Sequence, residues 1–147
     1  DKYRKGNNMK VVVNRCYGGF GLSDKACEML MKRKGFGCFR YKQTKYKYRD
    51  GVEEYTRCES FGKDDMFTHY QTIDLGKKID KLPNETYWWY GRLERDDTDL
   101  IAVVEELGEE ADGRFAKLEV VEIPDGVNWE LDDYDGIETI HEVHRSW

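Results

Sequence analysis

The residues with the clearest chemical potential lie in the stretch NRCYGGFGLS, from Asn14 to Ser23, directly after three valines. Glycine has no Cβ, so a ligand can come close to the backbone, and the free N–H groups at a helix start attract anions. We therefore expect a loop that binds a phosphate-bearing small molecule, and its candidate ligand-binding residues are Asn14, Arg15, Tyr17, Gly18, Gly19, Gly21 and Ser23. The spacing matches neither the Walker A motif nor the GxGxxG fingerprint, and a tight structural corner is the alternative interpretation.

Cys16 is the one residue of this stretch that could act as a nucleophile, because thiol pKa values fall near helix N-termini. A nucleophile also needs a base, and the only histidines are His69, His141 and His144. We expect a buried strand cysteine and no catalytic residues, so the chain is predicted to bind and not to catalyse. A small nucleotide-processing enzyme that uses the same glycine-rich loop is the alternative.

Two patterns near the C-terminus imitate metal sites. HEVH, from His141 to His144, is one residue shorter than the zincin motif, and on a strand the two imidazoles point to opposite faces. LDDYDGIETIHE resembles a calcium loop but has Leu131 at the first ligand position. The four cysteines have no zinc-site spacing and are predicted to be reduced thiols. We expect no metal and no cofactor.

Charge is divided unevenly along the chain. Residues 1–49 carry 14 Lys and Arg against 3 Asp and Glu, whereas residues 50–147 carry 10 against 27. The two halves can pair within one fold, or opposite poles can drive homo-oligomer formation. The acidic region 92–147 could also imitate nucleic acid.

A basic and aromatic ribbon follows in residues 39–49. If Gln43 and Thr44 form a two-residue turn, tyrosines gather on one side and cations on the other. The predicted basic surface consists of Arg40, Lys42, Lys45 and Lys47. Cations for phosphates and rings for stacking make nucleic-acid binding the second alternative function.

Hydrophobic periodicity, caps and turn residues predict the elements that position these groups. The fold class expected from them is α+β, with a mostly antiparallel sheet of about seven strands and two helices. The helices are predicted at residues 24–34, between the N-cap Ser23 and Gly35, and at 98–107, between an N-cap at Asp97 or Thr98 and the C-cap Gly108. The strands are predicted at 9–17, 38–59 as a three-stranded meander, 86–93, 114–123, 127–131 and 137–144. Residues 9–147 are expected to form a single domain, and residues 1–8 a flexible arm or a cloning remnant.

Two segments of the chain, MKVVVNRCYGGFGLS at residues 9–23 and DDYDGIETIHEVHRSW at residues 132–147, resemble a family of small bacteriophage and prophage proteins. The resemblance covers about residues 9–24 and 92–147 and leaves out the basic ribbon. It transfers no catalytic residues. It implies a phage-encoded binding protein that antagonises a host system, by binding a host protein or by sequestering a phosphate-bearing small molecule.

The same resemblance places the protein in the cytosol of the host cell. No apolar stretch approaches the roughly 20 residues that a membrane span needs, and no signal peptide is visible, so we expect no membrane association.

Overall fold

The computed structural model describes residues 8–46, 51–59 and 67–143 of the chain. This part contains two α-helices and nine strands, and every strand pair in it is antiparallel. The predicted α+β class is confirmed. The strand number exceeds the expected seven because β4 (His69–Gln71) and β5 (Lys78–Ile79) lie in a segment where no strand was predicted, whereas β6 (Tyr87–Trp88) falls within the strand predicted over residues 86–93. We expected one domain over residues 9–147. The chain forms two compact units, one of residues 1–26 and 93–147 and one of residues 27–92, described separately below.

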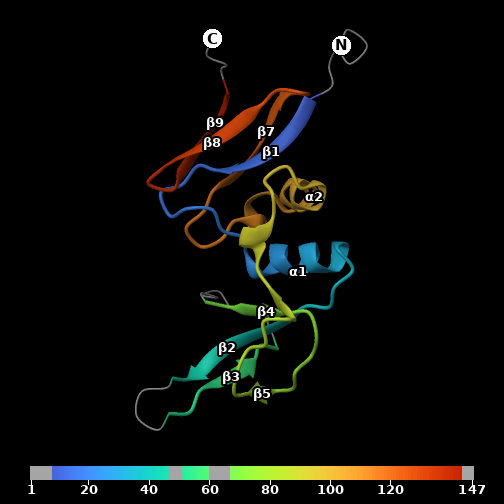
Figure 1. Cartoon of the computed structure of the whole chain (residues 1–147), viewed down its shortest axis with the longest axis vertical. Helices are drawn as coiled ribbons and strands as arrows, with labels where there is room; N and C mark the ends of the chain where they lie inside the picture. The colour runs from blue at the N-terminus through green and yellow to red at the C-terminus, as the bar shows by residue number, and fades with distance from the viewer. Residues whose placement is uncertain (1–7, 47–50, 60–66, 144–147) are drawn as a thin grey trace. The chain divides into compact units, whose positions relative to one another are not determined.

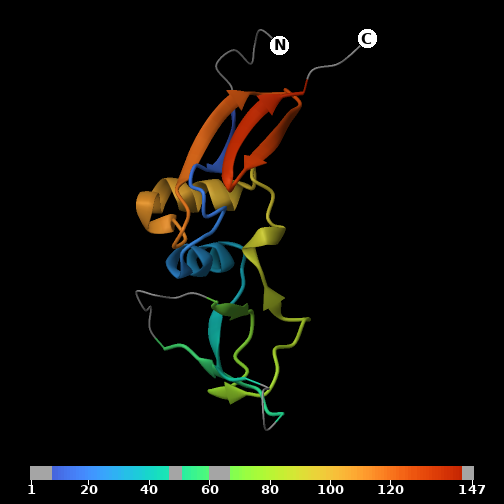
Figure 2. The same ribbon diagram turned by 90° about the vertical axis from the view of Figure 1, so that its left-hand side faces the viewer.

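The first unit is built on the pair formed by β1 (Asn8–Asn14) and β7 (Leu118–Pro124). Helix α2 (Thr98–Leu107) packs against both strands, and β9 (Ile137–Glu142) also contacts β1 (Figures 1 and 2). Strand β9 forms a hairpin with β8 (Trp129–Tyr134). Because β1 is covered on both sides, its three consecutive valines are all fully buried instead of alternating between core and solvent.

Helix α2 begins and ends where its capping residues predict. The Asp97 side chain accepts hydrogen bonds from the backbone N–H groups of Asp99 and Leu100, at 2.9 and 3.0 Å. Gly108, at a φ of 59°, closes the helix by donating its N–H to the carbonyl of Val104. A 3₁₀ turn, η3 (Gly108–Ala111), follows.

Helix α1 (Asp24–Arg33) begins in the first unit and ends in the second. The hydroxyl of Ser23 caps its start by accepting the N–H of Ala26 at 3.1 Å, as predicted. Gly35, at a φ of +85°, ends it, and the N–H of Phe36 donates to the carbonyl of Met31 at 2.8 Å.

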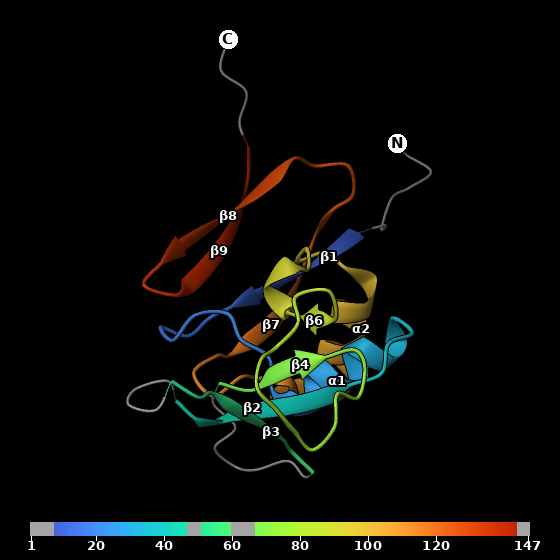
Figure 3. The ribbon, with the colours of Figure 1, turned by 60° about the horizontal axis from the view of Figure 1, so that its bottom comes forward.

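The second unit is a five-stranded sheet with the strand order β5-β3-β2-β4-β6 (Figure 3). Its longer strands are β2 (Phe39–Lys45), β3 (Glu54–Arg57) and β4 (His69–Gln71). Tyr41, Tyr70 and Trp88 are buried, and the last two rings meet edge to face at 5.8 Å. The predicted strand over residues 86–93 is shorter than expected, since η2 (Tyr90–Arg92) follows directly.

The prediction of a turn at Gln43 and Thr44 is wrong. Strand β2 runs through both residues, and its partner is β3, with Lys45 opposite Glu54. Thr44 favours the extended backbone because it is β-branched, and its hydroxyl lies 2.8 Å from that of Thr56 across the strand pair. The tyrosines and cations that we expected to face each other across that turn therefore do not do so.

Candidate functional site

A fully buried asparagine, Asn14 at the end of β1, joins three separate loops of the first unit. Its Nδ2 donates to the carbonyls of Cys16 and Gly136, at 2.7 and 2.6 Å. Its Oδ1 accepts the backbone N–H groups of Cys16 and Lys117, at 3.3 and 2.9 Å. Both donors and both acceptor positions of the amide are thus used, which leaves Asn14 no group for a ligand.

Glu138 on β9 stands beside this amide as a buried carboxylate. The backbone N–H of Asn14 donates to its Oε1 at 2.8 Å, and Arg95 binds both carboxylate oxygens, with Nη2 2.7 Å from Oε2. The Arg95 guanidinium in turn lies 3.7 Å from the centre of the Phe20 ring. A buried charge is tolerated only when it is paired and hydrogen-bonded, and here it is both. We call Asn14, Glu138 and Arg95 the polar node.

The three loops that the polar node joins are the segment 15–22 after β1, the segment 112–117 before β7, and the β8–β9 turn at Asp135 and Gly136. They are in van der Waals contact. A Cβ on Gly18 would lie 2.1 Å from the Cβ of Phe115, and one on Gly136 would lie 2.3 Å from the carbonyl oxygen of Tyr17. The loops meet on the left of Figure 1. Only glycine permits this approach, so two of the glycines serve loop packing.

A large exposed aromatic ring lies on each of the first two loops, and a third lies at the end of β8, directly before the β8–β9 turn. Tyr17, Phe115 and Tyr134 are 70%, 54% and 77% exposed, and the Arg114 guanidinium lies 5.3 Å from the centre of the Phe115 ring. We call these three side chains the ring face. Sequence reasoning placed Tyr17 in the candidate site but missed Phe115 and Tyr134, because their loops are about 100 residues further along the chain.

The remaining residues of the predicted anion loop are largely engaged within the protein. Arg15 donates to the carboxylate of Glu119 at 2.9 Å and to the carbonyl of Glu138 at 2.7 Å. Gly19 donates its N–H to the carbonyl of Cys16 at 3.2 Å, and the carbonyl of Gly21 accepts from Gly113 at 3.0 Å.

Ser23, the last residue of that loop, is engaged in the same way. Its N–H donates to the carbonyl of Ala111 at 2.9 Å, and its hydroxyl donates to the carbonyl of Glu110 at 2.6 Å besides capping α1. The polar groups of Asn14, Arg15 and Ser23 thus make hydrogen bonds within the protein, and anion binding by this loop stays a prediction.

The predicted basic surface differs from its expected layout as well. Arg40 is buried, at 7% exposure, on the central strand β2. Lys45 forms an ion pair with Glu54 at 3.3 Å, and Lys42 is half-buried on β2. Lys47 lies outside the described residues. Arg40 is therefore not part of an exposed cationic platform.

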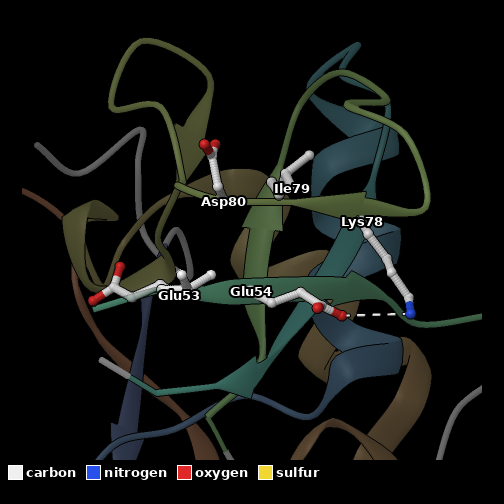
Figure 4. A pocket seen from close by; sticks show the side chains of 6 residues that line it. Glu53, Glu54, Lys78, Ile79 and Asp80 are labelled. Atoms are coloured by element: carbon white, nitrogen blue, oxygen red, sulfur yellow. Dashed lines mark ion pairs between the residues drawn. The ribbon is translucent and has the colours of Figure 1, made fainter. Parts of the chain in front are cut away.

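An open pocket of about 470 Å³ lies in the second unit, between the start of β3 and strand β5 (Figure 4). Glu54 lines it and pairs with Lys45 and with Lys78, the latter at 3.5 Å. Desolvation raises the pKa of Glu54, but the hydrogen bond from Lys45 and the charge of Lys78 outweigh it and lower the pKa. Figure 4 shows Glu53 and Asp80 pointing away from Glu54, so these carboxylates do not form an acid–base pair.

His69 is enclosed by aromatic rings in the second unit. Its Nδ1 lies 2.9 Å from the hydroxyl of Tyr87, and the rings of Tyr55 and Tyr87 are centred 5.8 and 5.9 Å away. Burial lowers the pKa of His69 and favours the neutral imidazole.

One group of side chains in the described part of the chain could hold a metal ion, and it lies on the β8–β9 hairpin. Glu130, Asp132 and His141 each offer a ligand atom, and these atoms lie within 4.8 Å of one another. The partner of His141 in the HEVH pattern, His144, lies outside the described residues. All four cysteines are described, and none forms a disulfide.

Among the described residues, neither helix is long and apolar enough to cross a membrane. No protein-family model, curated protein or solved structure matches this chain. Its candidate site is therefore defined by its own geometry: a ring face held in place by the polar node.

Proposed function

We propose that this chain is a phage-encoded, non-catalytic binding protein that antagonises a host system by binding a host protein through the ring face. The observation that carries the proposal is the exposure of Tyr17, Phe115 and Tyr134 on or directly beside three loops that a buried polar node holds together. Folding alone does not call for rings at these positions, since exposed rings gain little hydrophobic stabilisation.

Aromatic side chains are the residues most often responsible for the affinity of a protein interface. Their contribution is largest when they are ordered before binding, because ordering loops and side chains during association costs free energy. Asn14 fixes the backbone on which all three rings stand, through carbonyls and N–H groups of each loop. The ring face thus has the composition of a binding surface and stands on a backbone that is held in place before binding.

The charge of the first unit indicates the kind of partner. Residues 93–147 carry 18 Asp and Glu against 4 Lys and Arg, and residues 1–26 carry only 6 basic residues against 2 acidic ones. An acidic protein attracts a partner with a basic surface and speeds their encounter. The proposed partner is therefore a host protein with a basic rim, the kind of surface with which proteins contact nucleic acid.

Capture of a phosphate-bearing small molecule is less well supported, because the loop donors predicted to bind it are used internally. Arg15 and Ser23 make contacts within the protein, and the amide of Asn14 is fully occupied. Binding of nucleic acid through β2 has less support for a similar reason, since Arg40 is buried.

The proposal is tested with a ring-face variant, Tyr17→Ser, Phe115→Ser and Tyr134→Ser. Serine keeps the Cβ atom that packs against Gly18, so the loops keep their contacts. A control variant carries Phe36→Ser, Tyr46→Ser and Phe67→Ser, at three rings of the second unit that are 44%, 53% and 81% exposed. The tagged wild-type chain is used to capture and identify the host partner, and the dissociation constants of all three proteins are then measured with the purified partner.

We expect the ring-face variant to bind roughly 100-fold more weakly, about 2.7 kcal/mol, and the control to bind within about twofold of wild type. Equal affinities of the ring-face variant and the wild type would contradict the proposal. So would multiple-turnover chemistry on a nucleotide, which would favour the enzyme alternative.

A further inference from the structure

We propose that the outer face of the β8–β9 hairpin binds one divalent transition-metal ion of the Zn²⁺ type, with Glu130, Asp132 and His141 as ligands. The site shares the β8–β9 hairpin with Tyr134 of the ring face, and it does not depend on the proposed function.

The register of the hairpin brings the three side chains to one face. Glu130 and Asp132 are two residues apart on β8 and therefore point to the same side, and His141 on β9 is the direct cross-strand partner of Glu130. His141 Nε2 lies 2.7 Å from Glu130 Oε1, and His141 Nδ1 lies 2.8 Å from Asp132 Oδ2. The imidazole thus stands between the two carboxylates.

The donor set suits a borderline metal ion. Zinc binds imidazole nitrogen and carboxylate oxygen at about 2.0–2.2 Å, so ligand atoms on one ion are roughly 3–4 Å apart. The ligand atoms of this group are all within 4.8 Å of one another. One ion would take one nitrogen of His141, so the carboxylate that bonds the other ring nitrogen would move to the ion. An imidazole nitrogen favours Zn²⁺, Co²⁺ or Ni²⁺ over Mg²⁺ and Ca²⁺, which prefer oxygen.

The charge around the cluster supplies a second, independent reason for a cation. Residues 129–142 contain six Asp and Glu and no Lys or Arg. Among the described contacts, Arg95 neutralises Glu138, which is buried. Glu130 and Asp132 are exposed, with side chains 57% and 64% accessible, and a divalent cation would neutralise both.

The hairpin also holds the ligands on a fixed backbone. Asp135 and Gly136, with φ values of 51° and 89°, form the tight turn, and Asp133 accepts the N–H of Gly136 at 2.8 Å. Asn14 anchors the same turn through the carbonyl of Gly136. Ligands on paired strands keep their spacing better than ligands on a mobile loop, which favours chelation.

The experiment titrates Zn²⁺ into the metal-free full-length chain against a chromogenic zinc chelator, and records the visible absorption of the Co²⁺ form. The variants are His141→Gln, Glu130→Gln and Asp132→Asn. The matched control is Glu142→Gln, an exposed carboxylate next to His141 on β9 that lies on the opposite face. Thermal unfolding of each variant without metal verifies the fold.

We expect one equivalent of Zn²⁺ and a Co²⁺ band typical of four- or five-coordinate N/O ligation. His141→Gln should weaken binding by at least about 100-fold, each carboxylate variant by at least about tenfold, and Glu142→Gln by less than about twofold. Absence of stoichiometric binding at micromolar Zn²⁺ would overturn the proposal. Equal effects of His141→Gln and Glu142→Gln, or binding that persists in all variants, would overturn it too.

Discussion

In each of the two units, one buried side chain holds loop backbone in place by hydrogen bonds, but the two side chains span very different separations in sequence. In the second unit, the hydroxyl of Tyr41 accepts the N–H of Leu75 and donates to the carbonyl of Gly76, both at 2.9 Å. In the first unit, Asn14 joins the loop that follows it to two loops that lie more than 100 residues further along the chain. Tyr41 secures one neighbouring loop, whereas Asn14 assembles a composite surface.

The buried side chains next to the loops differ accordingly, although both units also carry exposed rings. In the second unit, the rings of Tyr41, Tyr70 and Trp88 form the interior, while Phe36 and Phe67 are exposed. In the first unit, Asn14 and Glu138 of the polar node are buried beside the loops, and the rings of Tyr17 and Tyr134 are exposed to solvent. A ring that is buried stabilises the fold, and a ring that is held in solvent by a polar scaffold is available to a partner.

The largest effect is expected from breaking the ion pair of the polar node. Arg95→Met removes the cation from a carboxylate that is only 5% exposed and should lower the free energy of unfolding by about 3–5 kcal/mol. Urea denaturation measures the change. The double variant Arg95→Met, Glu138→Leu should recover most of it, because no unpaired charge then remains buried. A loss below about 1 kcal/mol in the single variant would show that the pair does not support the first unit.

A smaller loss is expected when the amide of the polar node is removed. Asn14→Ala leaves the Lys117 N–H and the Gly136 carbonyl without their partner, and should cost about 2–4 kcal/mol. Hydrogen exchange should quicken at Cys16 and Lys117 while protection in the five-stranded sheet stays unchanged. Faster exchange in the sheet of the second unit as well would argue that the two units do not respond separately.

The equivalent change in the second unit should have a milder effect. Tyr41→Phe keeps the buried ring and removes the hydroxyl that bonds Leu75 and Gly76, so we expect a loss of about 1–3 kcal/mol by urea denaturation. The affinity of the ring face for the proposed host partner should be unchanged in this variant. Weaker partner binding would contradict the assignment of binding to the first unit.

The smallest effect concerns pH. Burial lowers the pKa of His69 below its value in the unfolded chain, so the unfolded state binds more protons between the two pKa values. The contribution of His69 to stability should therefore be complete above about pH 6.5, its pKa in the unfolded chain, and should decline as the pH falls from that value toward the lower pKa of the folded state.

His69→Gln is the control for this pH effect. It should remove this component of the pH dependence between pH 7 and 5 and leave the contribution of the carboxylates. If the free energies of unfolding of the two proteins changed in parallel between pH 7 and 5, His69 would not contribute to the pH dependence of stability.

Local sequence signals predicted much of the fold. Ser23, Asp97 and Gly108 act as caps at the predicted positions, because a cap depends only on its own helix end. The turn at Gln43 and Thr44 was predicted wrongly, since pairing of β2 with β3 and β4 decides that segment and involves residues outside it.

The candidate site was less predictable than the fold. The glycine-rich loop was identified, but its role depends on Gly136 and Lys117, which contact Asn14 only in the folded chain. No local pattern relates Asn14 to residues more than 100 positions away. The close approach of Phe115 to Gly18 likewise arises only in the folded chain, and spacing alone does not reveal it.

Hydrogen–deuterium exchange of the chain with and without its purified host partner tests the central claim most directly. The account predicts that binding protects residues 16–21, 113–117 and 133–137 together, since the polar node makes these three loops one surface. Protection confined to residues 39–59 of the second unit, or to only one of the three loops, would contradict it.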